Sequence, residues 1–152
     1  TVVGLGERDC SVQRRHQKVA EESPSPAVTT AIRQKLLAAA EATGEAAGYP
    51  NAGTVEMLLD VDTDQVWFLE MNTRLQVEHP VTEMVTGLDL VAEQLRIAQG
   101  LPTSFGSTPP QPQGNALEMR IYAEDPRRFL PGPGTIDTWQ MPAGEHIRVD
   151  AG

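Results

Sequence analysis

The sequence contains a single cysteine, Cys10, in 152 residues. A disulfide framework needs pairs of cysteines, and a structural zinc site needs several Cys or His ligands at close spacing. The sequence offers neither pattern. A reducing, cytoplasmic compartment is therefore the location that fits best.

Long apolar runs and an excess of cations are also missing. No apolar run approaches the length of about 20 residues that a membrane-spanning helix needs. Lys and Arg number 12 against 21 Asp and Glu, which gives a formal net charge of -9 at pH 7. Because broad nucleic-acid-binding surfaces are basic, we expect neither a nucleic acid nor a membrane as a partner. Any anion must bind at a local site.

The composition is that of a globular protein, with 39% hydrophobic and 22% charged residues. The length suffices for one domain with a core, and at most for part of a second. The sequence starts at Thr1 rather than at Met and stops at Gly152 without a helix or a cap. We therefore expect an internal fragment of a longer protein.

The first half of the sequence predicts strands around one long helix. That helix should start after Thr29 or Thr30 and end at Gly48, because the apolar side chains between them recur at helical spacing. A turn is expected at residues 9–11. Strand character is found in residues 1–8, 17–22, 54–61 and 66–72, of which the last two should form a hairpin.

The second half predicts one further helix and a linker. Residues 89–99 have Asp89 as a cap, and Val91, Leu95 and Ala98 are expected to face inward. Residues 101–114 are rich in Pro, Gly, Ser and Thr and predict a connector. We place a domain boundary near residue 113, which divides the chain into residues 1–112 and 113–152, and we expect later strands at residues 116–124 and 135–141.

Residues 70–78 have a polar side chain at every second position. In a strand these side chains would share one face, with neighbours about 6.5 Å apart. A solvent-exposed edge is the simplest explanation of such a pattern. Full extension would also separate Glu70 and Glu78 by roughly 26 Å, so a shared site requires the chain to bend.

The expected hairpin supplies a partner for this run. With a three-residue loop, Val61 pairs with Gln65 and Glu56 lies directly opposite Glu70. Two carboxylates so placed repel each other unless a cation compensates, and in proteins that cation is often a metal ion. Oxygen donors from Glu56, Glu70 and Asn72 suit magnesium or manganese better than zinc.

The second half of the run has different chemistry. The Arg74 guanidinium and the Gln76 amide can bind a small planar oxyanion, and Glu78 can act as a base whose pKa the nearby Arg74 should lower. Residues 13–18, QRRHQK, add further groups that bind anions, although a solvated basic turn explains them equally well.

Three stretches together resemble the biotin carboxylase family, the ATP-grasp component of biotin-dependent carboxylases. They are ERDCSVQRRHQKVAEE at residues 7–22, FLEMNTRLQVEHPVTEM at residues 68–84, and YAEDP with FLPGPG at residues 122–134. The resemblance spans essentially the whole chain but only a minority of a full biotin carboxylase. It implies an α+β (α/β) fold: the C-terminal portion of an ATP-grasp fold, followed by the start of the biotin carboxylase C-terminal domain.

The resemblance also implies site residues. Two magnesium or manganese ions would be held by the metal ligands Glu56, Glu70 and Asn72. ATP would be bound by Gln13, His16, Leu58, Glu56 and Glu70. Bicarbonate and biotin would be bound by Lys18, Arg74, Gln76, the backbone of Val77, Glu78 and Arg120. Of these, the catalytic residues would be Glu78 as the base that deprotonates bicarbonate, Arg120 as the group that stabilises the biotin enolate, Lys18 and Arg74.

The reaction implied by the resemblance is that of an ATP-dependent carbon–nitrogen ligase. Bicarbonate attacks the γ-phosphate of ATP to give carboxyphosphate, which breaks down to CO2 and phosphate. The phosphate then deprotonates biotin, and the biotin enolate captures CO2. Phosphoryl transfer of this kind needs positioning and charge neutralisation more than covalent help from the protein.

The partners implied are a biotin carboxyl carrier protein or domain, a carboxyltransferase subunit, and a second copy of the full-length protein in a homodimer. The final carboxyl acceptor would be an acyl-CoA or pyruvate, as in acetyl-CoA carboxylase of fatty acid biosynthesis or in propionyl-CoA carboxylase. The family's glycine-rich ATP lid precedes the region matched, so the fragment alone is expected to be inactive. Two alternatives stay open: another ATP-grasp ligase of the carbamoyl-phosphate synthetase type, and a non-catalytic scaffold remnant.

Overall fold

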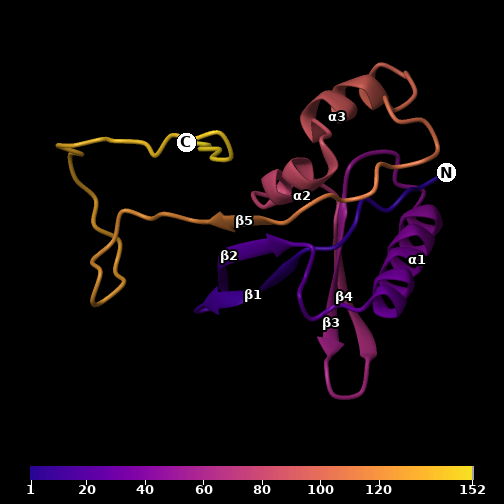
Figure 1. Cartoon of the computed structure of the whole chain (residues 1–152), viewed down its shortest axis with the longest axis horizontal. Helices are drawn as coiled ribbons and strands as arrows, with labels where there is room; N and C mark the ends of the chain where they lie inside the picture. Colours follow the sequence, from indigo (N-terminus) through magenta and orange to yellow (C-terminus); the bar gives the residue numbers. More distant parts are fainter. Residues whose placement is uncertain (152) are drawn as a thin grey trace. The chain divides into compact units, whose positions relative to one another are not determined.

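The computed structural model describes residues 1–151, which form two compact units: Thr1–Arg120, and a second that starts at Ile121. The first unit contains a three-stranded antiparallel sheet, a two-stranded antiparallel sheet and three helices (Figure 1). The larger sheet has the order β1-β2-β5, with strands β1 (Asp9–Arg14), β2 (Gln17–Ser23) and β5 (Ala116–Met119). The remaining elements are strands β3 (Thr54–Asp60) and β4 (Gln65–Asn72), and helices α1 (Thr30–Ala47), α2 (His79–Thr86) and α3 (Leu90–Ala98).

The expected strand at residues 1–8 and the expected turn at residues 9–11 are wrong. Strand β1 begins at Asp9, which pairs with Glu22 of β2, and the turn comes later, at Arg15 and His16. Part of this segment instead contacts α1: the Gly4 N–H donates to the Glu41 carboxylate at 2.8 Å, and the Glu7 carboxylate accepts from Arg33. Apolar residues form a strand only where another strand pairs with them, and β2 pairs with residues 9–14.

Helix α1 has the predicted ends. The Thr29 hydroxyl accepts a hydrogen bond from the Ile32 N–H at 3.3 Å, which caps the amino terminus. Gly48 ends the helix in the left-handed conformation with φ of 58°, and its N–H donates to the Glu45 carbonyl. Ile32 is buried and belongs to the small core of the unit together with Val81, Val85 and Leu90.

The hairpin of β3 and β4 brings Glu56 opposite Glu70, as predicted. The loop is longer than expected, because Asp60 rather than Val61 pairs with Gln65. Between Met57 and Glu56 the register shifts, because β4 contains one extra residue there. This shift brings Glu56 back to the expected partner, Glu70.

Helix α2 was not predicted. The chain bends after β4 ends at Asn72, and α2 starts with Pro80 in its first turn, where the missing N–H of proline costs nothing. Helix α3 begins after the expected cap, Asp89, whose carboxylate accepts from the Ala92 N–H at 2.8 Å. The expected inward face of α3 is wrong, because Val91 is 46% and Leu95 60% exposed.

The second unit is irregular. In the described part of it, residues 121–151, the only strand-type pairing is an isolated antiparallel bridge between Glu124 and Pro131. The strand expected at residues 116–124 ends at Met119 as β5, and the strand expected at residues 135–141 is absent from this described part of the chain. Over residues 1–151 as a whole, no helix combines the length and apolar character needed to span a bilayer.

Candidate active site

Glu78 lies at the centre of the site. It directly precedes α2, and only 2% of its surface is exposed. The Lys18 ammonium from β2 donates to one carboxylate oxygen of Glu78 at 2.7 Å, and Arg120, one residue beyond β5, donates to the other at 2.9 Å. The chain bend after β4 and the pairing of β5 with β2 thus bring together residues that are up to 102 positions apart, since Lys18 and Arg120 both reach Glu78.

The pKa of Glu78 lies below its usual value. Burial raises this pKa, but the hydrogen bond and charge of Lys18, a backbone hydrogen bond and the charge of Arg8 outweigh burial. The prediction that the pKa of Glu78 is lowered is confirmed. The prediction that Arg74 is the cation that lowers it is wrong. Arg74 is exposed and donates to the Leu75 carbonyl at 3.2 Å.

Glu56 forms the second acidic position of the cluster. Its Oε1 atom accepts from Lys18 at 2.7 Å, from Gln76 at 2.9 Å and from Asn72 at 3.3 Å. Burial raises the pKa of Glu56, and the hydrogen bonds from Lys18 and Gln76 lower it further than burial raises it. For Lys18, burial lowers the pKa, but the bonds to Glu56 and Glu78 leave it above its ordinary value.

The three predicted metal ligands lie together. Glu56 pairs with Glu70 across the hairpin, and the Asn72 amide donates to Glu70 at 2.9 Å and to Glu56 at 3.3 Å. Three donors converge on Oε1 of Glu56, so its Oε2 is left for a ligand. This set of two carboxylates and one amide fits magnesium or manganese in its chemistry. No group of three or more His, Cys, Asp or Glu side chains suited to a metal occurs within residues 1–151, so the amide of Asn72 is needed to complete a set of three.

Seven of the predicted site residues line one cavity. A cavity of about 660 Å³ includes Lys18, Glu56, Arg74, Gln76 and Glu78 in its lining, and the lining also includes Gln13 and Leu58. His16 occupies the turn between β1 and β2 and is not part of that lining. Val77 is 60% exposed.

Two acidic residues beside Arg120 were not predicted. Glu21 is 1% exposed, and its Oε1 atom forms an ion pair with Nη2 of Arg120 at 2.5 Å. Glu118 pairs directly with Glu21 between β5 and β2. Burial and the charge of Glu21 raise the pKa of Glu118 to about 7. Only the strand pairing reveals this cluster, since residues 21 and 118 are far apart in the sequence.

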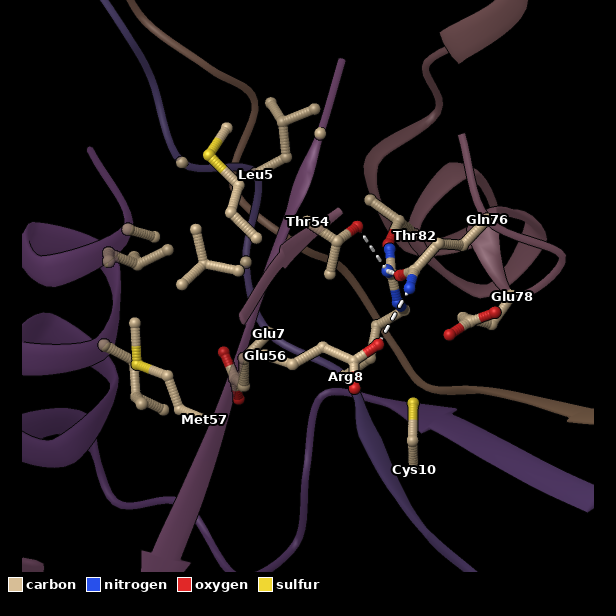
Figure 2. A pocket seen from close by; sticks show the side chains of 18 of the residues that line it. Leu5, Glu7, Arg8, Cys10, Thr54, Glu56, Met57, Gln76, Glu78 and Thr82 are labelled. Carbon is tan, nitrogen blue, oxygen red and sulfur yellow. Dashed lines mark hydrogen bonds between the residues drawn. The ribbon is translucent and has the colours of Figure 1, made fainter. Parts of the chain in front are cut away.

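Arg8 was also missed by the sequence analysis. Its guanidinium lies between Thr54, Gln76 and Thr82 and donates a hydrogen bond to each of them (Figure 2). The only signal in the sequence was an isolated cation within the stretch at residues 7–22, next to acidic residues.

Comparison with known proteins identifies the family. Residues 1–104 match the family model of the carbamoyl-phosphate synthase L chain, ATP binding domain, and residues 118–152 match that of the biotin carboxylase C-terminal domain. Biotin carboxylase 2 of Bacillus subtilis (strain 168) is 56% identical over 146 residues. The chain belongs to the biotin carboxylase family. The domain boundary predicted near residue 113 falls between the two family matches and stays a prediction.

Two solved biotin carboxylase structures are similar throughout the chain. A biotin carboxylase–β,γ-ATP complex from Campylobacter jejuni is 45% identical with a TM-score of 0.87, over 95% of this chain and 32% of that one. The biotin carboxylase domain of Hydrogenobacter thermophilus 2-oxoglutarate carboxylase, in complex with MgADP, ADP and bicarbonate, is 44% identical with a TM-score of 0.88, over 93% of this chain and 31% of that one.

These neighbours confirm the expected fold class, the later part of an ATP-grasp fold joined to the start of the C-terminal domain. The B. subtilis match covers 96% of this chain and 33% of that relative. The chain therefore spans about a third of the length of the biotin carboxylases it matches.

Proposed function

We propose that the protein containing this chain is a biotin carboxylase, which carboxylates biotin on a carrier protein with ATP and bicarbonate. The observation that carries the proposal is the buried Glu78 carboxylate held between Lys18 and Arg120. A carboxylate whose pKa is lowered stays ionised at neutral pH and can accept a proton from a small acid bound beside it.

In the first step Glu78 takes the proton of bicarbonate, and a bicarbonate oxygen attacks the γ-phosphate of ATP, so that carboxyphosphate forms and ADP leaves. Lys18, Arg74, Gln76 and the backbone of Val77 would orient the bicarbonate. Because a guanidinium and an ammonium only donate hydrogen bonds, they suit an anionic substrate. Carboxyphosphate then breaks down to CO2 and phosphate, and the phosphate deprotonates biotin.

Arg120 has the second role in this proposal. The enolate of biotin carries negative charge on its ureido oxygen, and a guanidinium beside it would stabilise that charge. The ion pairs of Arg120 with Glu78 and Glu21 keep its guanidinium at the site in the absence of biotin.

ATP would be contacted by Gln13, His16 and Leu58. Glu56, Glu70 and Asn72 would hold magnesium or manganese ions, which when bound neutralise phosphate charge. The partners that follow from this function are a biotin carrier, a carboxyltransferase and a second copy of the full-length protein. We place the protein in the cytoplasm, with an acyl-CoA or pyruvate as the final acceptor, as in acetyl-CoA carboxylase of fatty acid biosynthesis.

A second candidate is an ATP-grasp ligase of the carbamoyl-phosphate synthetase type, because the model matched by residues 1–104 carries that description. The match of residues 118–152 to the biotin carboxylase C-terminal domain, and the contact of Arg120 with Glu78, favour biotin as the acceptor.

ADP release by the full-length protein, with magnesium and bicarbonate, tests the proposal when it is measured with and without free biotin. We expect a bicarbonate-dependent rate that biotin stimulates. ADP release without stimulation by biotin would contradict the choice of acceptor and favour the second candidate. Absence of turnover would favour a non-catalytic scaffold.

A further inference from the structure

Arg8 joins three parts of the first unit. Its Nη2 atom donates to the Thr54 hydroxyl at the start of β3 at 2.9 Å and to Oε1 of Gln76 at 2.8 Å, and its Nη1 atom donates to the Thr82 hydroxyl in α2 at 3.1 Å. Gln76 and Thr82 are 5% and 6% exposed, so these contacts are largely withdrawn from water. Figure 2 shows the guanidinium between its three acceptors, next to Glu56 and Glu78.

This contact determines which way the Gln76 amide points. A side-chain amide has one accepting oxygen and one donating NH2 group, and a guanidinium can only donate. Arg8 therefore requires Oε1 of Gln76 on its own side and directs Nε2 the opposite way. There Nε2 donates to Glu56 at 2.9 Å, so both ends of the amide agree on one orientation.

The orientation matters for an anion. With Nε2 turned to the cavity, Gln76 offers N–H groups to a bound carboxylate-like oxygen, whereas the flipped amide would present its own oxygen and repel it. Burial makes the difference larger, because water cannot compensate for a wrongly turned amide.

We propose that Arg8 is a positioning residue that holds Gln76 as a hydrogen-bond donor to the bicarbonate-like anion. The inference rests on the proposed function, in which Gln76 contacts bicarbonate. Arg8 acts through Gln76, and further hydrogen bonds to Thr54 and Thr82 hold its guanidinium in place.

Two substitutions separate this role from a general effect on folding. Arg8→Lys keeps a group that only donates, so the amide orientation is retained with fewer contacts. Arg8→Gln introduces a group that both donates and accepts, so residue 8 no longer excludes the flipped amide and only Glu56 still opposes it. If Arg8 had only a structural role, Arg8→Lys and Arg8→Gln would have the same bicarbonate KM when compared at equal thermal midpoints.

The experiment measures the KM values for bicarbonate and for ATP in the full-length protein. We expect Arg8→Gln to raise the bicarbonate KM about tenfold, which corresponds to about 1.4 kcal/mol. We expect Arg8→Lys to raise it about threefold, and the ATP KM to change less than about twofold in both. Arg33→Lys is the matched control. Arg33 lies in α1 and binds Glu7 through paired hydrogen bonds, so its substitution should leave both KM values unchanged.

A double-mutant cycle with Gln76→Ala completes the test. If Arg8 acts through Gln76, Arg8→Gln should raise the bicarbonate KM by less than about twofold once Gln76 is already Ala. Equal effects in the two backgrounds, or a rise in the ATP KM of the same size, would overturn the inference. If Arg8→Gln does not fold, Arg8→Lys carries the same cycle.

Failure of the proposed function can be told apart from failure of the Arg8 role. If the proposed function is wrong, the unmodified protein releases ADP at a rate that does not depend on bicarbonate. A bicarbonate-dependent unmodified enzyme with an unaffected Arg8→Gln variant would overturn the role of Arg8 alone.

Discussion

Glu78 has three properties that a base for bicarbonate requires: it is buried, it is ionised at neutral pH, and it is held in one orientation. Burial by itself would work against ionisation, since it raises the pKa of a carboxyl group. The hydrogen bond from Lys18 and the nearby charges reverse the direction. The low pKa of Glu78 therefore depends chiefly on Lys18 of β2 rather than on Arg74, which lies four residues before it in the sequence.

Replacing Glu78 with Gln should remove the proposed base while preserving the shape of the side chain. We expect bicarbonate-dependent ATP hydrolysis by the full-length protein to fall at least about 100-fold, because general-base catalysis contributes on that order. Nucleotide affinity, measured by ATP titration, should change less than about twofold. Glu41→Gln on α1 serves as the control, since a Gln oxygen can still accept from Gly4. Unaltered turnover in Glu78→Gln would rule out the base.

At the scale of elements, the pairing of β2 with β5 creates an unusual acidic pair. Glu21 and Glu118 lie directly opposite each other, and the charges nearby include those of Arg120, Glu78 and Arg8. Like charges opposite each other in a sheet are destabilising when both are ionised. With a pKa of about 7, Glu118 is largely protonated below neutral pH, which removes its charge from the pair.

This pair should make stability depend on pH. The pKa of Glu118 is about 7 in the folded protein against an ordinary 4.5, so the folded state binds the proton more strongly. Stability should therefore be highest below about pH 4.5 as far as this group is concerned, and should fall as the pH rises from about 4.5 to about 7.

Glu118→Gln should abolish this dependence. We expect it to stabilise the full-length protein at pH 8 by about 1 kcal/mol, a value discounted for the partial exposure of the side chain. The thermal midpoint at pH 5 should hardly change. Glu22→Gln on β2, the strand that pairs with β5, is the control. Equal shifts at pH 5 and pH 8 would contradict the raised pKa of Glu118.

At the scale of the whole molecule, the chain has a small core and exposed apolar side chains. The β3–β4 hairpin leaves Leu58, Trp67 and Phe68 more than half exposed. Large exposed apolar patches usually mark surfaces that another part of a protein covers. The relatives matched are about three times as long, since the chain spans 33% of the first of them.

We therefore expect the isolated segment of residues 1–152 to be catalytically inactive. ADP release should be undetectable for this segment with magnesium, bicarbonate and biotin, while the full-length protein turns over. The isolated segment should also bind a dye for exposed apolar surface more strongly than the full-length protein does. Bicarbonate-dependent turnover by the segment alone would contradict this expectation.

Local features were predictable where the physical cause is local. Thr29 and Gly48 bound α1 because a hydroxyl caps the first turn and glycine adopts the left-handed conformation at the last. The face-to-face pairing of Glu56 and Glu70 was also predictable, although the loop was assigned one residue too short. Helix α2 was missed, because its eight residues directly follow a run whose alternation indicated a strand.

The sequence by itself determined the family, the caps of the long helix, the hairpin and the identity of the acidic, amide and basic groups at the site. These depend on residue type and on short spacings. Only the tertiary structure decided which cation meets Glu78, which carboxylates meet across β2 and β5, and which donor orients Gln76. The residues that Arg8 contacts, for example, lie 46 to 74 positions away in the sequence. No local pattern specifies a pairing over such separations.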